Sequence, residues 1–107
     1  MHFYQLFKGY KRIKTKIKGK TYTLAIADTP RKKKIGLSKI KDLPKNHGML
    51  FVYNTPVDHS FTMKDTGIPL HIIFLDKDFK ILKDFKGKPY QKNAINPGVK
   101  YSYVIEI

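Results

Sequence analysis

Histidine, carboxylate and lysine side chains gather between residues 58 and 71, and they are the groups of this sequence best suited to chemistry. They are Asp58, His59, Lys64, Asp65, Thr66 and His71. Histidine and carboxylate can exchange protons as general acid and base, or bind a metal ion. Their spacing matches no HxH or HExxH motif, and the sequence has no glycine-rich phosphate loop or serine nucleophile elbow. The sequence therefore predicts no catalytic residue, metal or cofactor, and leaves one candidate ligand-binding set: Lys64, Asp65, Thr66 and His71.

Each part of that set also has a purely structural interpretation. The run Lys64-Asp65-Thr66-Gly67 is typical of a turn in which the Asp65 or Thr66 side chain accepts a hydrogen bond from the backbone. His71 lies between two apolar residues, where a half-buried, hydrogen-bonded histidine is expected. Both interpretations stay open from the sequence alone.

Lysine dominates the charge of the chain. There are 22 Lys and Arg residues against 8 Asp and Glu, a formal net charge of +14, and only Arg12 and Arg31 are arginine. Such a charge attracts nucleic acid or acidic proteins, although an AT-rich genome also favours lysine and lysine solubilises a surface without binding. We expect an acidic protein surface or nucleic acid as partner, with protein assembly as a further option and the oligomeric state open. The candidate polyanion-facing residues are Lys14, Lys16, Lys18, Arg31, Lys32, Lys33 and Lys34.

Alternating apolar and polar residues over 12–27 predict a β-hairpin. With Gly19-Lys20 as a two-residue turn, Ile17 lies opposite Tyr22 and Ile13 lies opposite Ile26. Both strands then place their apolar side chains on the same face.

Further short elements follow the hairpin. A helix is predicted over 29–37, capped by Asp28 or Thr29 and ended by Gly36. Strands are predicted over 49–53, 59–64, 70–75, 81–85 and 101–107, with irregular segments over 42–48 and 86–98. This pattern indicates a mainly β fold, a small antiparallel β-barrel or sandwich-like domain with one or two short helices. The expected core residues are Ile13, Ile17, Leu24, Ile26, Leu50, Phe51, Phe61, Met63, Ile72, Phe74, Ile81 and Val104.

Length and composition limit the class of protein. A chain of 107 residues with 41% hydrophobic residues fits a single domain over 1–107. Without cysteine, disulfides and thiolate chemistry are excluded. The first residues lack the features of a signal peptide, and no apolar run reaches the roughly 20 residues that span a bilayer. We expect a cytoplasmic or virion location and no membrane span.

Several short fragments in fixed order carry a family resemblance. They include Ala27-Asp28-Thr29, Gly48-Met49-Leu50-Phe51-Val52, Phe61-x-Met63-Lys64-x-Thr66, Ile68-Pro69-Leu70 and Tyr103-Val104-x-Glu106. With them the chain resembles domain-of-unknown-function family 192 of bacteria, archaea and phages over roughly residues 20–107, leaving 1–19 as an N-terminal extension and first hairpin strand. The resemblance implies a compact, mainly antiparallel, barrel-like β domain and no established activity. The chain departs from the family at Thr62, Asp65 and His71, where the family usually has Trp, Asn and Asp.

The leading functional hypothesis is a non-catalytic binding or structural module whose basic surface meets an acidic partner. A phage or other viral accessory or capsid-associated protein fits the small size and the lysine bias. One alternative is sequence-nonspecific binding of nucleic acid. The other is an enzyme or a binding protein for a small anionic ligand, which requires the segment from Lys64 to His71 to line a concave pocket.

Overall fold

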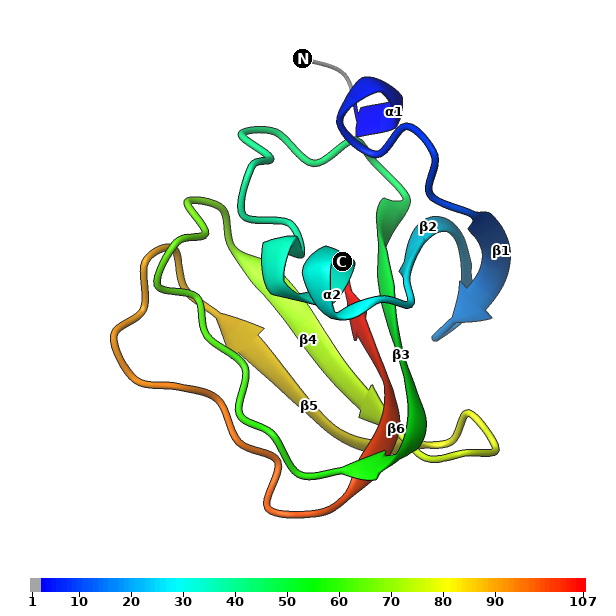
Figure 1. Cartoon of the computed structure of the whole chain (residues 1–107), viewed down its shortest axis with the longest axis vertical. Coiled ribbons are helices and arrows are strands. Elements are labelled where there is room, and N and C mark those ends of the chain that lie inside the picture. The colour runs from blue at the N-terminus through cyan, green and yellow to red at the C-terminus, as the bar shows by residue number, and fades with distance from the viewer. Residues whose placement is uncertain (1–2) are drawn as a thin grey trace.

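One six-stranded mixed sheet and two short helices make up the computed structural model, which describes residues 3–107 (Figure 1). The strand order in the sheet is β1-β2-β3-β6-β4-β5, so that β6 lies at its centre. The prediction of a mainly β fold with short helices is confirmed, and the sheet is sandwich-like rather than closed into a barrel. In chain order the elements are α1 (Phe3–Leu6), β1 (Arg12–Ile17), β2 (Lys20–Ala27), α2 (Pro30–Ile35), β3 (His47–Val57), β4 (Leu70–Leu75), β5 (Ile81–Gly87) and β6 (Tyr101–Glu106).

The β1–β2 hairpin turns at Lys18 and Gly19, so the predicted Gly19-Lys20 turn is wrong by one position. Both turn residues have positive φ, 50° and 86°, as the two central residues of a type I′ turn do. Ile13 consequently lies opposite Leu24 rather than Ile26, a shift of two residues in register. Because the shift is even, the apolar side chains keep the face that was predicted for them.

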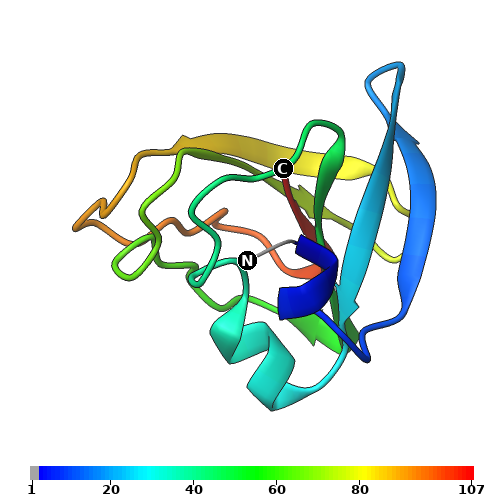
Figure 2. The same ribbon diagram turned by 90° about the horizontal axis from the view of Figure 1, so that it is seen from above.

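Helix α2 connects two parallel neighbours, β2 and β3. Parallel strands need a crossover, and here the crossover carries the helix over one face of the sheet (Figure 2). The sequence specifies its ends: the Thr29 side chain accepts a hydrogen bond from the Lys32 backbone at 3.2 Å, Pro30 occupies the first turn, and Gly36 ends the helix. The predicted helix over 29–37 is thus confirmed, whereas the parallel pair differs from the expected antiparallel arrangement.

The strand predicted over 59–64 is wrong. Only Phe61 pairs there, through an isolated bridge to Ile95 with hydrogen bonds of 2.8 and 2.7 Å. The alternation in this segment arises because Phe61 and Met63 face the core while their neighbours face solvent. Strand β3, by contrast, runs to Val57 and passes Pro56, which was expected to lie beyond its end, by way of an irregularity after Val52.

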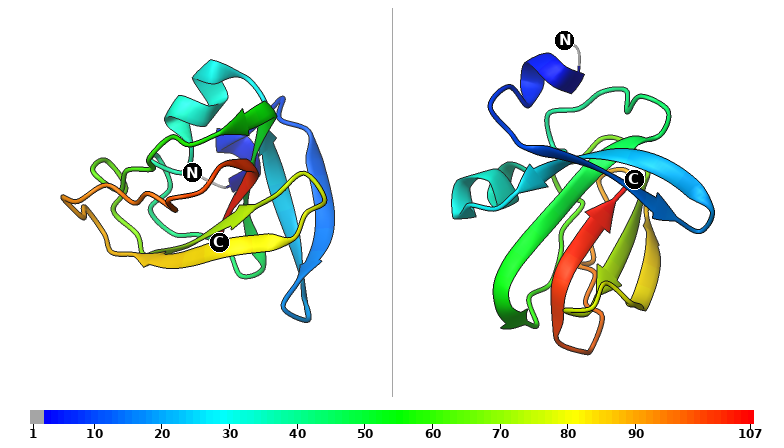
Figure 3. Two further views of the ribbon diagram at one scale, coloured as in Figure 1. Left: turned by 90° about the horizontal axis from the view of Figure 1, so that it is seen from below. Right: turned by 90° about the vertical axis from the view of Figure 1, so that its right-hand side faces the viewer.

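Both faces of the sheet are covered. The larger core lies on the face of the sheet that α2 covers. It includes Phe3 and Phe7, which belong to the N-terminal segment that was expected to be an extension. A smaller core lies on the other face around Leu24, Ile73 and Ile105, where the β1–β2 end of the sheet is turned across the other strands (Figure 3). Most of the expected core residues are buried, but Ile13, Ile26 and Phe61 are half-buried, and Ile81 is wrong because it lies 45% exposed on the edge strand β5.

Candidate ligand-binding site

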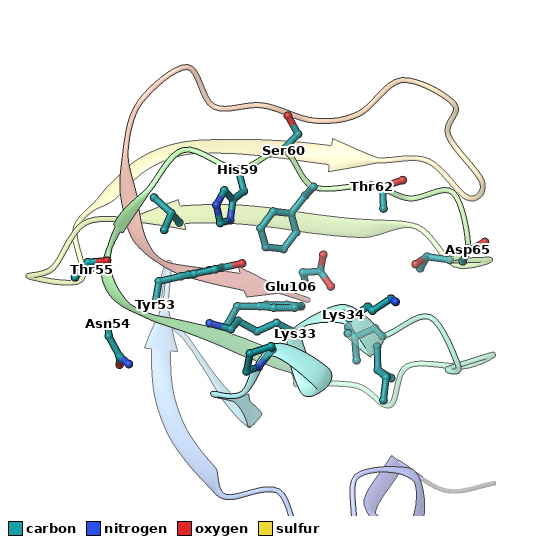
Figure 4. Close-up of a pocket in the computed structure, with 18 residues that line it drawn as sticks. Lys33, Lys34, Tyr53, Asn54, Thr55, His59, Ser60, Thr62, Asp65 and Glu106 are labelled. Atoms are coloured by element: carbon teal, nitrogen blue, oxygen red, sulfur yellow. The ribbon is translucent and has the colours of Figure 1, made fainter.

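A pocket of about 650 Å³ opens between α2, the second half of β3 and the segment over 58–66 (Figure 4). Its wall and floor combine aromatic rings, the side chains of α2 and the hydroxyl groups of the 60–66 segment. The pocket lies on the face of the sheet that carries the larger core. This volume falls in the range of small-molecule sites, roughly 300–1,000 Å³.

The carboxyl group of Glu106 lies at the floor of the pocket. Glu106 belongs to the central strand β6, where Met49 of β3 and Ile72 of β4 lie beside it in register. Its side chain points into the pocket (Figure 4), although the residue is only 5% exposed. Within residues 3–107 the carboxyl group has no hydrogen bond or ion pair, and burial raises the pKa of Glu106 to about 8.

Helix α2 brings two lysines to the pocket, and they differ in what they contact. The Lys33 ammonium donates a hydrogen bond to the Val52 carbonyl oxygen at 2.9 Å and lies 4.1 Å from the centre of the Tyr53 ring. Lys34 is exposed at the rim. Gly36, at the end of the helix, has φ +49° and lets the backbone approach the Phe51 ring, which a Cβ would meet at 3.3 Å. The helix end and the aromatic wall are therefore in direct contact.

Aromatic side chains build the opposite wall. The rings of Phe51 and Phe61 meet edge to face, with 5.1 Å between their centres, and Tyr53 meets Tyr101 in the same way at 5.5 Å. The Tyr101 hydroxyl donates to the His59 carbonyl oxygen at 2.6 Å and so ties the segment over 58–60 to β6. Burial, and secondly the negative charge of Glu106, raise the pKa of Tyr53 to about 12.

The structure separates the four residues of the predicted ligand-binding set. Asp65 and Thr66 line the pocket, Thr66 buried and Asp65 exposed at the rim. Lys64 is exposed outside the lining. His71 lies on the opposite face of the sheet, where its Nε2 is 3.6 Å from an Asp84 carboxylate oxygen. Within the described part of the chain, no three His, Asp or Glu side chains are grouped closely enough to hold a metal ion.

The main pocket residues that sequence reasoning missed are Glu106, Tyr53 and Phe61, and Lys33 was assigned to a polyanion surface instead. A usable signal existed for one of them. Glu106 is the only glutamate of the chain and lies inside an apolar strand, a position where a carboxyl group is costly to bury. Nothing in the sequence places Lys33 in the same pocket, because only the β2–α2–β3 crossover brings the helix there.

The seven residues of the predicted polyanion set do not form one surface. Lys14 and Lys16 are exposed on the edge strand β1, and Lys18 pairs with Asp84 of β5 at 2.8 Å. The others belong to α2, which lies on the opposite side of the molecule from the β1–β2 turn (Figure 2). There Lys32 lies 3.6 Å from the Asp28 carboxylate, while Lys33 and Lys34 line the pocket.

Comparison with known proteins agrees with the fold. The sequence profile of DUF192, described as "Uncharacterized ACR", matches residues 13–107. A crystal structure from Sinorhizobium meliloti 1021, of a protein with the provisional description of a transcription regulator, is 26% identical with a TM-score of 0.80, covering 92% of this chain and 81% of that one. A protein of unknown function from Novosphingobium aromaticivorans DSM 12444 is 22% identical with a TM-score of 0.75, covering 94% and 83%.

The other comparisons add little about function. No protein of the curated set matches the chain. Neither helix of residues 3–107 has the length and apolar character needed to cross a membrane.

Proposed function

The chain belongs to the DUF192 family, whose description assigns no activity, and we propose that it is a non-catalytic binding module that holds a small organic ligand in the pocket above Glu106. The observation that carries this proposal is the largely buried carboxyl group of Glu106, which faces an open cavity and has no partner among residues 3–107. Buried polar groups are nearly always hydrogen-bonded, to protein, water or ligand. A polar group of a ligand at this position would supply the hydrogen-bond partner that the Glu106 carboxyl group lacks in the described part of the chain.

The surroundings of the carboxyl group favour binding over turnover. In the described residues, no serine or threonine hydroxyl is hydrogen-bonded to His59, the histidine of the pocket. Ser60, which precedes the aromatic wall, instead accepts a hydrogen bond from the Asn96 amide at 2.9 Å. A hydroxyl nucleophile needs an adjacent base, and the pocket does not supply that pair.

Narrowing the pocket at Thr62 should weaken the binding of small ligands. Thr62 is exposed and lines the pocket, so Thr62→Trp adds volume without disturbing the core. We expect fragments that bind the wild type, detected by NMR as shifts of the Phe51, Thr66 and Glu106 amide signals, to bind the variant about tenfold more weakly, a loss of about 1.4 kcal/mol.

Thr21→Trp, at an exposed threonine of β2 outside the pocket, is the matched control and should leave the affinities unchanged. The proposal fails if no fragment shifts the pocket signals at millimolar concentration, or if both tryptophan variants bind equally well.

Contact with a polyanion is a second candidate, supported by the exposed lysines of edge strand β1. Lys14 and Lys16 point to the same side of the strand, about 7 Å apart, as alternate residues do. The relative from Sinorhizobium meliloti, with its provisional description of a transcription regulator, adds support for nucleic acid as the polyanion. Lysine provides a hydrated point charge, which suits loose contact with phosphates rather than reading of bases.

Reversing the charge of this row should weaken binding to DNA, RNA or heparin. For Lys14→Glu/Lys16→Glu/Lys18→Glu we expect the slope of log affinity against log salt to fall by about 2 to 3, since each phosphate-contacting lysine contributes about 1. Fluorescence anisotropy between low and physiological salt measures that slope. The control variant Lys39→Glu/Lys41→Glu/Lys45→Glu has the same net charge as the first variant but changes lysines outside β1. It therefore tests whether the position of the lost charges matters. Equal losses in both variants would mean that total charge, and not the β1 row, attracts the polyanion.

A further inference from the structure

We infer that the inner end of the pocket receives an organic ammonium group, held between the Glu106 carboxylate and the rings of Phe51 and Phe61. This inference rests on the proposed function, because it names the chemical class of the ligand for the same pocket. It follows from three features of the pocket. The Glu106 carboxyl group has no cationic partner in the described part of the chain, aromatic rings line the same wall, and the two lysines are either already bonded or exposed at the rim.

The first feature is that no positive charge of residues 3–107 is paired with Glu106. Burial alone accounts for the raised pKa of this carboxyl group, with no opposing contribution from a lysine. Lys33 is held away by its hydrogen bond to the Val52 carbonyl oxygen. In a chain with a net charge of +14, a buried acid that has no cationic partner in the described part of the chain leaves room for a cation from outside.

The second feature is the aromatic wall beside the carboxyl group. Phe51, Tyr53 and Phe61 all line the pocket. The negative face of an aromatic ring attracts a cation, and aromatic rings line the sites that recognise organic ammonium ligands. Tyr53 already takes part in this kind of contact, because the Lys33 ammonium lies 4.1 Å from its ring centre. The pocket therefore offers both kinds of group that bind an alkylammonium ion.

The third feature argues against an anionic group at the inner end. Once Glu106 is ionised, above about pH 8, a carboxylate or phosphate placed there would lie against a like charge. Lys34 is exposed at the rim and Lys33 is engaged at Val52 and Tyr53, so neither compensates that charge at the inner end. With Glu106 ionised, an anion is thus accommodated only near the mouth of the pocket, on the α2 side.

Binding of an ammonium ion to this site is coupled to proton release. Below pH 8 the Glu106 carboxyl group carries a proton, which leaves to solvent when the ammonium N–H groups donate to the carboxylate. The other titratable or charged side chains of the pocket are Lys33 and Lys34 from α2, Tyr53 from β3, and His59 and Asp65 from the segment over 58–66. Among these side-chain types, only histidine ordinarily changes charge near neutral pH, so a His59→Gln variant measures that contribution.

Three hexyl compounds that differ only in the head group test the inference: n-hexylamine, 1-hexanol and hexanoate. Isothermal titration calorimetry at pH 6.5 and 8.5, in buffers of different ionisation enthalpy, gives the affinity and the number of protons released. We expect the wild type to bind hexylamine more tightly than hexanol or hexanoate. Its affinity for hexylamine should be at least about tenfold higher at pH 8.5 than at pH 6.5, because one proton must leave Glu106. His59→Gln should retain this pH dependence.

The Glu106→Gln variant should lose the preference for hexylamine and its pH dependence while still binding hexanol. Asp42→Asn removes an exposed carboxylate outside the pocket and should behave as the wild type. If hexanol or hexanoate binds the wild-type pocket at pH 8.5 as well as hexylamine does, the inference is overturned and the proposed function stands. If no hexyl compound binds, both fail. The pH series on the wild type alone decides the question should Glu106→Gln not fold.

Discussion

Replacing Phe74 with alanine is expected to lower the free energy of unfolding by about 3–5 kcal/mol. Phe74 is fully buried in β4, and its ring lies between the sheet and the segments that cover it. Its centre is 4.8 Å from that of Tyr101, 5.6 Å from Phe61 and 5.9 Å from Phe85. Removing the ring creates a cavity among three aromatic neighbours, which cannot close without moving the wall of the pocket.

Urea unfolding followed by circular dichroism measures this loss. Ile81→Ala is the control, because Ile81 lies on β5, 45% exposed, and should cost less than about 1 kcal/mol. Comparable losses in the two variants, or a loss below about 1 kcal/mol for Phe74→Ala, would contradict the place of Phe74 in the core.

Continuous apolar runs made the buried strands predictable. The run over 70–75 coincides with β4, since a strand that is covered on both faces needs no polar alternation. The run over 49–53 marks the buried half of β3, but the strand extends to Val57 because later residues pair with β6 beyond an irregularity. Pairing between distant strands has no local signature, so the order of the sheet and its parallel β2–β3 pair could not be derived from the sequence.

The alternation over 59–64 was misleading for a related reason. Phe61 and Met63 face the core, as period-two alternation indicated, yet the segment crosses over the sheet instead of joining it. Burial on one side produces the same pattern whether or not the backbone forms a ladder. Local chemistry was more reliable at α2, where Thr29 and Gly36 define the ends of the helix through their own hydrogen bonds.

Only part of the candidate site could be predicted from the sequence, because residues near in sequence and residues near in space differ there. Asp65 and Thr66 belong to the cluster of histidine, carboxylate and lysine side chains that was predicted to bind a ligand, and both line the pocket. His71 was grouped with them by nearness in sequence, but strand alternation places it on the other face, beside Asp84. Glu106 and Lys33 are 73 positions apart and line the same pocket only in the folded chain, so the topology and not the local sequence brings them there.

Burial of Glu106 should make the stability of the protein fall as the pH rises. The folded state raises the pKa of this carboxyl group from 4.5 to about 8, so the folded protein keeps the proton over a range in which the unfolded chain has lost it. Below about pH 4.5 both states are protonated and the group imposes no cost. Between pH 4.5 and 8 the unfolded state is increasingly favoured, and above pH 8 the cost levels off on the order of 4–5 kcal/mol.

Glu106→Gln should remove that pH-dependent cost, because the amide is close in shape to the protonated acid and does not ionise. We expect the variant and the wild type to have similar free energies of unfolding at pH 5, and the variant to be more stable by several kcal/mol at pH 9. Urea unfolding at pH 5, 7 and 9 measures the difference at each pH, which cancels the general effect of the high positive charge. Asp42→Asn, at an exposed loop carboxylate, should differ from the wild type by a constant amount. A difference between Glu106→Gln and the wild type that is the same at pH 5 and pH 9 would show that the Glu106 carboxyl group ionises as easily in the folded protein as in the unfolded chain.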